Sequence, residues 1–197
     1  ARKVRIGNKL ILSDSLFCDV IDNTVSGGRV VRFEFEKGNF DDILDKLGHP
    51  PLPPHIERPT TQNDKERYQT VYAEKRGAVA APIAGLHFTP QILKKLEKKG
   101  VNIYYITLHI GLGTFKPVQV EDLNRHHMDS EYFEVSPSTA VAINEAKRKR
   151  RRIFAVGTST VRALETVNVS GFQISPKKGW TNKFIPVSYT HLTLPTI

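Results

Sequence analysis

The sequence predicts an α/β protein in which a small, mainly β region precedes a larger domain that mixes helices and strands. Residues 29–36, RVVRFEFE, alternate apolar and charged side chains, which is typical of a half-buried antiparallel strand. Residues 78–110 contain a small apolar run, a loop, a basic amphipathic segment and a β-branched run, in the order of a strand–helix–strand unit. A third apolar run, at 153–156, leads into a polar turn that opens another helix.

The first 54 residues are predicted to hold part of a small β domain and a connector. Short strands separated by turns rich in glycine and serine fill residues 4–36, and a helix capped by Asn39 and ended by Gly48 follows. The prolines of residues 50–54 force an extended path, so we interpret this segment as a stiff connector. A ligand for an SH3-type module is the less favoured alternative.

Residues 55–185 are predicted to form part of an α/β domain. A helix is expected over residues 64–77, with its tyrosines packed in the core. The apolar run 78–81, a helix capped by Thr89 and the strand 101–110 then predict a βαβ unit with parallel pairing and a right-handed crossover. Ligand-binding loops are expected at the carboxyl ends of its strands.

Composition narrows the class of protein. Of 197 residues, 39% are hydrophobic and 25% charged, an ordinary balance for a globular protein. The 29 Lys and Arg against 20 Asp and Glu give a net charge of +9, which attracts polyanions such as RNA, although many basic proteins bind none. The single cysteine, Cys18, excludes an internal disulfide and a cysteine metal site.

The sequence shows no targeting signal. No apolar run approaches the roughly 18 residues of a membrane span, and there is no secretory signal pattern, so we expect a cytoplasmic protein. The chain begins with Ala1 rather than Met and enters strand-like alternation at once, so we expect that it lacks its natural start.

Two histidines lie in similar settings. His87 and His109 each stand between apolar neighbours and within two residues of a glycine, where backbone can approach a ligand closely. Imidazole titrates near neutral pH, which suits proton transfer. A lone histidine is more often a packed or surface residue, so it is the repeated context that favours a shared pocket.

A basic block follows the helix that Ser136 is expected to cap, after a strand at 132–135. It consists of Lys147, Arg148, Lys149, Arg150, Arg151 and Arg152. Cations at a helix C-terminus offset the macrodipole, so a solvated helix end is the first interpretation. Contact with nucleic-acid phosphates is the second.

Two turns resemble anion-binding loops. Residues 157–160, Gly-Thr-Ser-Thr, open a helix that carries Arg162, and free N–H groups, three hydroxyls and the helix dipole converge there. We therefore infer an anion site. Residues 111–114, Gly-Leu-Gly-Thr, lack the third glycine of a dinucleotide loop, and Pro117 interrupts any helix that should follow, which argues against a Rossmann site.

Longer motifs occur in a fixed order along the chain. They are PLPPHI at 51–56, YQTVYA at 68–73, APIAGLHFT at 81–89, TLHIGLGTFKPV at 107–118 and AVGTSTVRALE at 155–165. Together they resemble the S-adenosylmethionine:tRNA ribosyltransferase-isomerase family of queuosine biosynthesis, from about Arg2 to Ile185. Residues 186–197 do not continue the pattern, and we expect a non-family, artefactual tail there.

The resemblance implies a barrel-like α/β catalytic domain, present in part, into which the β region is inserted. It implies an enzyme that moves the ribosyl part of S-adenosylmethionine onto 7-aminomethyl-7-deazaguanine at the wobble position of tRNA. The product is epoxyqueuosine, and adenine and methionine are released. S-adenosylmethionine is then the ribosyl-donating substrate, tRNA is the partner, and neither a prosthetic group nor a metal is expected. We expect a monomer.

The resemblance also suggests site residues. His87 and His109 are the candidates for proton transfer and adenine contact, and Glu131 for holding the sulfonium or a ribose hydroxyl. The candidates for substrate binding are Gly85, Thr89, Gly111, Gly113, Thr114, Thr158, Ser159, Thr160 and Arg162. The last four are expected to take the methionine carboxylate or an RNA phosphate. Lys147, Arg148, Lys149, Arg150 and Arg151 are the candidates for RNA binding.

Two positions depart from the family pattern. Ile83 stands where the family usually has Thr, and Asp129 replaces the usual His of a Met-His-Ser-Glu motif. Two rival functions stay open on the residues alone, a noncatalytic RNA-binding fragment and a generic phosphate-binding α/β protein. Release of methionine and adenine from S-adenosylmethionine would separate the enzyme from both.

Overall fold

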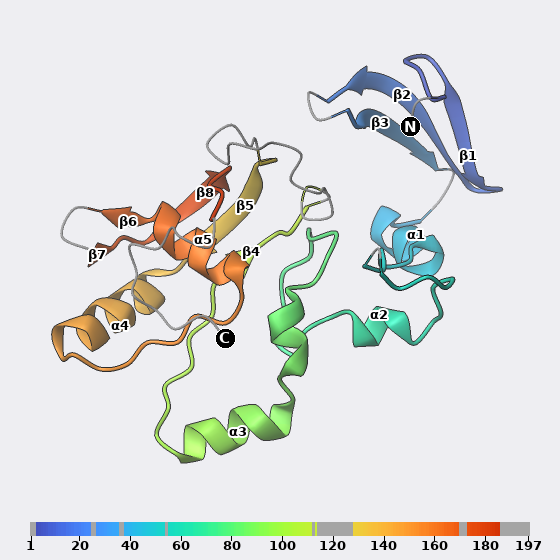
Figure 1. Cartoon of the computed structure of the whole chain (residues 1–197). Coiled ribbons are helices and arrows are strands. Elements are labelled where there is room, and N and C mark those ends of the chain that lie inside the picture. Colours follow the sequence, from blue (N-terminus) through green and yellow to red (C-terminus); the bar gives the residue numbers. More distant parts are fainter. Residues whose placement is uncertain are drawn as a thin grey trace. The chain divides into compact units, whose positions relative to one another are not determined.

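The computed structural model is a mixed α/β structure with small antiparallel sheets (Figure 1). It describes residues 3–24, 27–35, 38–53, 55–111, 113, 128–169 and 173–185. The chain divides into two compact units, Ala1–His49 and Pro50–Ile197. The division falls where the proline-rich segment begins.

The first unit is built on a three-stranded antiparallel sheet in the order β1-β2-β3. Its strands are β1 Lys9–Ser13, β2 Leu16–Asn23 and β3 Arg29–Phe35, which confirms the short strands and the antiparallel pairing predicted from the sequence. On the central strand Leu16, Cys18 and Val20 are buried, while Phe17 and Asp19 between them are only partly covered. This alternation follows from the period of two of a strand with one buried face.

Helix α1, Phe40–Leu47, completes the first unit. The side chain of Asn39 accepts a hydrogen bond from the Asp41 N–H at 3.1 Å, so the predicted cap is confirmed. The Phe40 ring lies 4.8 Å from the Phe33 ring and 5.8 Å from that of Phe35, centroid to centroid. Aromatic packing therefore joins the start of the helix to the last strand.

The second unit contains the sheet that positions the candidate site. Strands β4 Thr107–Leu108, β5 Glu131–Val135 and β8 Lys177–Thr181 pair antiparallel in the order β4-β5-β8. A hairpin of β6 Asn168–Val169 and β7 Gln173–Ile174 lies between α5 and β8 in the chain.

The predicted parallel βαβ unit is wrong for the described residues, where every strand pair is antiparallel. Residues 78–81 form no strand, because the N–H groups of Val79 and Ala80 both point to one carbonyl, that of Ile110, at 2.8 and 3.3 Å. Two donors on one acceptor do not make a ladder. The predicted strand 101–110 shortens to β4, whose partner is β5.

The helices of the second unit are α2 Asp64–Arg67, α3 Pro90–Lys98, α4 Pro137–Arg148 and α5 Thr158–Thr166, with a 3₁₀ turn, η1, at Ile83–His87. Two predicted caps are confirmed. Thr89 accepts from the Ile92 N–H at 3.2 Å, and Ser136 accepts from that of Thr139 at 3.2 Å.

The long helix predicted over residues 64–77 is wrong, since α2 ends at Arg67. Past this point Thr70 is buried, and the Tyr72 ring packs on Tyr105 with centroids 5.5 Å apart. These tertiary contacts outweigh the helical spacing of the apolar side chains, and the β-branched residues of this stretch favour helix weakly.

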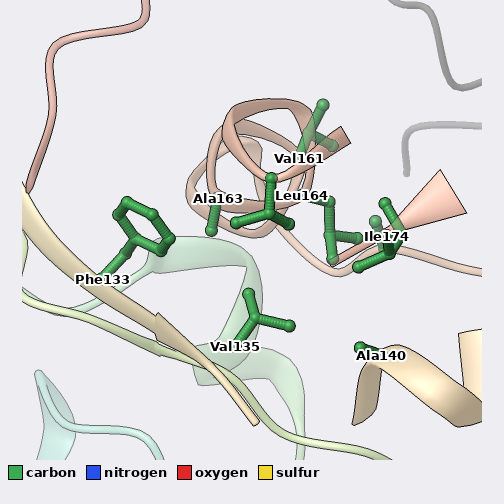
Figure 2. Close-up of a cluster of buried hydrophobic side chains, with 9 residues drawn as sticks. Phe133, Val135, Ala140, Val161, Ala163, Leu164 and Ile174 are labelled. Atoms are coloured by element: carbon green, nitrogen blue, oxygen red, sulfur yellow. The ribbon is translucent and has the colours of Figure 1, made fainter. Parts of the chain in front are cut away.

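The core of the second unit lies between the sheet and α5 (Figure 2). Phe133 and Val135 of β5 are buried against Val161, Ala163 and Leu164 of α5, and Ala140 and Ile174 close one end. The segment before α5 is not the predicted buried strand. The structure assigns no strand to 153–156, and Phe154 is 53% exposed.

Candidate active site

His109 follows β4 directly and is held by β5. Its backbone N–H donates to the Tyr132 carbonyl at 2.8 Å, which extends the pairing of the two strands. Its half-buried ring stacks on the Tyr132 ring, with centroids 5.5 Å apart and planes at 21°. The imidazole for which the sequence predicts proton transfer therefore has a defined position on the sheet.

Gly77 lies close to this imidazole. A Cβ at residue 77 would lie 2.9 Å from Cε1 and 3.0 Å from Nδ1 of His109, closer than carbon atoms approach without displacement. The backbone of Gly77 has φ +136°, a conformation that only glycine adopts without strain. The sequence predicted Gly77 only as the end of a helix, and its contact with His109 depends on the tertiary structure.

A buried ion pair joins β5 to α5. An Arg162 Nη1–H donates to the Glu131 Oε2, and the side chains are 10% and 1% exposed, respectively. The second carboxylate oxygen accepts the Gly111 N–H at 2.8 Å. Burial lowers the pKa of Arg162 from its ordinary value, and the carboxylate of Glu131 opposes this shift. The structure thus brings together two predicted site residues that the sequence placed in different roles.

The glycine segment after β4 lies beside the acidic residues that precede and begin β5. A Cβ at Gly113 would be 3.0 Å from both Cβ and Oδ2 of Asp129, and one at Gly111 would be 3.8 Å from Glu131 Oε1. Gly111 and Gly113 therefore lie close to these two acidic side chains. Thr114, another predicted binding residue, lies outside the described residues.

Gly85 is buried in the middle of η1. A Cβ there would collide with the Tyr72 hydroxyl and lie 2.8 Å from Thr70 Cγ2. Burial raises the pKa of the Tyr72 hydroxyl above its ordinary value, and Tyr105 adds to the shift. The predicted role of Gly85 in binding stays a prediction, and its place in the fold follows from close packing on Tyr72.

His87 ends η1 and is exposed. The hydroxyl oxygen of Thr89 accepts the hydrogen bond that caps α3. In the part of the chain that the structure describes, no hydrogen bond or ring contact joins His87 to His109. A shared pocket for the two histidines stays a prediction.

The N-terminus of α5 lies beside η1. Gly157, with φ +86°, precedes the helix, and a Cβ there would be 3.7 Å from the Ala84 Cβ. No side chain caps this helix, and the Thr160 hydroxyl donates to the Val156 carbonyl at 2.7 Å. Thr158 is exposed and Ser159 is partly exposed, and the first turn of the helix has no side-chain cap, which is compatible with an anion site.

The basic block begins within the last turn of α4 and continues past it. Arg148, Lys149, Arg150 and Arg151 are exposed, and Lys149 pairs with Glu145 at 3.0 Å. Arg150 has φ +51°, and the Arg151 N–H reaches back to the Ala146 carbonyl at 2.8 Å. This is a Schellman-type end with arginine at the position that favours glycine.

The described part of the chain contains no helix long and apolar enough to cross a membrane. In the same part, no three side chains among His, Cys, Asp and Glu are grouped as metal ligands. Tyr132 and Trp180 were not among the site residues predicted from the sequence. The alternation of β5 could have assigned Tyr132 to the face opposite the core, but its contact with His109 depends on strand pairing.

Comparison with known proteins places the chain in a family. The family described as "Queuosine biosynthesis protein" matches residues 1–194, so the match extends past Ile185 into the segment for which the sequence predicts a non-family tail. That segment lies outside the described residues.

Curated relatives agree with this match. The S-adenosylmethionine:tRNA ribosyltransferase-isomerase of Cytophaga hutchinsonii is 49% identical over 189 residues, covering 94% of this chain and 54% of the relative. That of Flavobacterium psychrophilum is 50% identical over 190 residues, with the same coverage of 94% and 54%. A crystal structure of the S-adenosylmethionine tRNA ribosyltransferase of Thermotoga maritima aligns with TM-score 0.40 and 23% identity, over 99% of this chain and 51% of that one.

The chain spans about half the length of the curated relatives it matches. The family match covers almost all of its residues, and the predicted motifs lie within the matched range. The chain therefore belongs to the queuosine biosynthesis protein family.

Proposed function

We propose that this chain carries part of the active site of a tRNA-modifying transferase and isomerase. The reaction moves the ribosyl part of S-adenosylmethionine onto 7-aminomethyl-7-deazaguanine at the wobble position and gives epoxyqueuosine, with release of adenine and methionine. The observation that carries the proposal is the position of His109. Its ring stacks on Tyr132. Two residues later, the N–H of Gly111 donates to the buried carboxylate of Glu131. The complete catalytic domain is proposed to be barrel-like, with the β unit inserted into it.

His109 is proposed to transfer a proton. The positive sulfonium of the substrate makes the adjacent carbon acidic. The position of the acid or base in the protein therefore matters more than its strength. The backbone hydrogen bond from His109 and the aromatic contact with Tyr132 position the imidazole, and Gly77 provides the space that the ring occupies. His87, exposed at the end of η1, is proposed as the second member of the pair.

Glu131 is proposed to hold the sulfonium or a ribose hydroxyl. Its carboxylate already accepts from Gly111 and pairs with Arg162, so it is fixed in place before a substrate arrives. Arg162 donates to Glu131 through Nη1, and its other guanidinium N–H groups are proposed to contact the methionine carboxylate or an RNA phosphate. Substrate binding and the ion pair would then be linked.

The start of α5 is proposed to take the methionine carboxylate or a phosphate. Gly157 leaves the first turn without a side-chain cap, and Thr158 is exposed and Ser159 partly exposed in that turn. Backbone N–H groups at a helix N-terminus attract an anion through their orphan hydrogens and the helix dipole. The glycines of the sequence-predicted site, with Thr89 and Thr114, are proposed to line the substrate cavity.

RNA is proposed to bind at residues 147–151 of the basic block. This segment is largely exposed, and an arginine occupies the left-handed position where glycine would be less strained. With its tRNA partner the protein is proposed to act in the cytoplasm, as a monomer and without a prosthetic group.

The first test uses this chain joined to the remaining C-terminal part of the Cytophaga hutchinsonii relative. His109→Ala should lower the release of adenine and methionine by roughly 10²- to 10⁴-fold while tRNA binding changes little. The matched control is His49→Ala, an exposed histidine outside the family motifs, which should retain turnover. Equal turnover in the two variants would remove His109 from the mechanism.

The second test addresses the RNA contact. Replacing Lys147, Lys149 and Arg151 together by Ser should reduce the salt slope of tRNA binding by up to about 0.9 for each phosphate that the protein no longer neutralises. An unchanged slope would assign the block to a solvated helix end.

A further inference from the structure

The sheet β4-β5-β8 has two faces of different chemistry. On β5, Glu131, Phe133 and Val135 are buried on the side where α5 packs, so Tyr132 and Glu134 point to the opposite side. The register places Tyr132 opposite Trp180 and Glu134 opposite Lys178. The face away from the core therefore carries aromatic and charged side chains from two neighbouring strands.

Three aromatic rings form a row across this face. The Tyr132 ring stacks on His109 at 5.5 Å, and the Trp180 ring meets Tyr132 edge-on at 5.9 Å, centroid to centroid. We call His109, Tyr132 and Trp180 the aromatic row. It runs from the candidate catalytic imidazole to the surface, where Trp180 is 71% exposed.

An exposed tryptophan at the end of an ordered row has a physical cost. Indole buries a large apolar area when it is covered, so leaving it in water gives up that stabilisation. Single exposed apolar residues are common, but here the exposed ring makes an edge-on contact with Tyr132 at the end of the row. An indole that is both held and exposed suits a flat, aromatic ligand that stacks on it.

Charges beside the row indicate which flat ligand fits. Lys178 lies opposite Glu134, and Lys75 pairs with Glu134, so two cations accompany one carboxylate on this face. The chain as a whole carries a net charge of +9. A partner with aromatic faces and a negative backbone matches both features, and unpaired nucleotides of RNA have this combination.

We propose that the aromatic row is a stacking platform for an unpaired nucleobase of the RNA substrate, with Trp180 as its outermost contact. The inference rests on the proposed function and adds to it a binding surface. Stacking on Trp180 and Tyr132 brings the bound strand along the sheet toward His109, while the lysines attract its phosphates. Stacking accepts any base, so the row contributes affinity and position rather than sequence choice.

Trp180 makes the inference directly measurable, because it is the single tryptophan of the chain. Its fluorescence should be quenched when the 197-residue chain is titrated with an RNA anticodon stem–loop, whose loop bases are unpaired. A fully paired RNA duplex of the same length and S-adenosylmethionine alone should quench it much less. Quenching by S-adenosylmethionine and not by the stem–loop would assign the row to the substrate's adenine and overturn the inference.

Substitutions separate stacking from charge. Trp180→Leu should weaken stem–loop binding by roughly 5- to 150-fold, the range for removing one base stack, without changing the salt slope. Trp180→Phe keeps a ring and should lose less affinity. The matched control is Tyr104→Leu, at an aromatic side chain that is also exposed, at 51%, but lies outside the row, and it should change affinity by less than about twofold.

The outcomes distinguish this inference from the proposed function. Circular dichroism of Trp180→Leu should match that of the unmodified chain, because the side chain is exposed. Salt-dependent stem–loop binding with equal affinity in Trp180→Leu and the unmodified chain would overturn the platform and leave the RNA contact of the basic block in place. Absence of stem–loop binding by the unmodified chain would overturn both.

Discussion

Two ion pairs of the second unit use the same chemical groups in different surroundings. Asp64 is buried but its partner Arg58 is 42% exposed, and the two are six residues apart in the chain. Glu131 and Arg162 are both buried and lie 31 residues apart, on β5 and α5. The first pair stabilises a turn, whereas the second holds together the two elements that frame the candidate site.

The comparison teaches how much of a pair's effect depends on its surroundings. Around Asp64, the Arg58 guanidinium donates twice and the Thr61 N–H and hydroxyl add two more hydrogen bonds, so the carboxylate is well satisfied while Arg58 still reaches water. Around Glu131 the loss of either partner would leave a charge in the interior. Buried charges without partners are costly, whereas a pair in contact with water is worth little.

The largest effect is expected from breaking the buried pair. Glu131→Leu should lower the free energy of unfolding by about 3–5 kcal/mol, because Arg162 is left charged in the interior. The double variant Glu131→Leu, Arg162→Met should recover most of this loss while activity stays lost. Urea titrations of both variants measure the coupling, and additive effects would mean that the two charges act independently.

The second effect concerns the glycine that packs on the site. Gly77→Ala should destabilise the second unit by roughly 2 kcal/mol or more, because backbone strain at φ +136° adds to the collision with His109. Gly100→Ala is the matched control, with φ +77° and nothing within 4 Å of its Cβ, so it should show strain alone, about 1 kcal/mol. Thermal unfolding compares them, and equal losses would mean that the contact with His109 is not tight.

The third effect is the pH dependence of the stability that the Asp64–Arg58 pair contributes. The Arg58 guanidinium, followed by the Thr61 N–H, holds the pKa of Asp64 well below its usual range. A lowered folded-state pKa contributes stability above the unfolded value of about 3.9, and this stability is lost as the pH falls toward the folded value. Asp64→Asn should therefore be less stable than the unmodified chain at neutral pH, and the difference should shrink below about pH 4. A difference that stays constant down to about pH 2 would contradict the lowered pKa.

The smallest effect is expected at a position outside both pairs. Arg150→Gly should stabilise the end of α4 by about 0.5–1 kcal/mol, because φ +51° is unstrained for glycine. The same change should weaken tRNA binding if Arg150 contacts phosphate. Arg151→Ser, at a residue outside the left-handed region, should weaken binding without the gain in stability. A gain in stability with unchanged affinity would remove Arg150 from the RNA surface.

The sequence by itself predicted the features that depend on near neighbours. Asn39, Thr89 and Ser136 cap helices as predicted, since a cap is a bond between a side chain and an N–H two or three residues later. The turn between β1 and β2 was equally local. The longer motifs predicted the family, which the family match then confirmed.

Only the tertiary structure decided which distant segments meet. Periodicity identified β5 as a strand but carries no information on its partners, so the antiparallel order β4-β5-β8 could not be predicted. For the same reason, the sequence could not predict the pairing of Glu131 with Arg162 or the contact of Gly77 with His109. Contacts across tens of residues depend on how the core packs between β5 and α5, and the local sequence on either side is compatible with several arrangements.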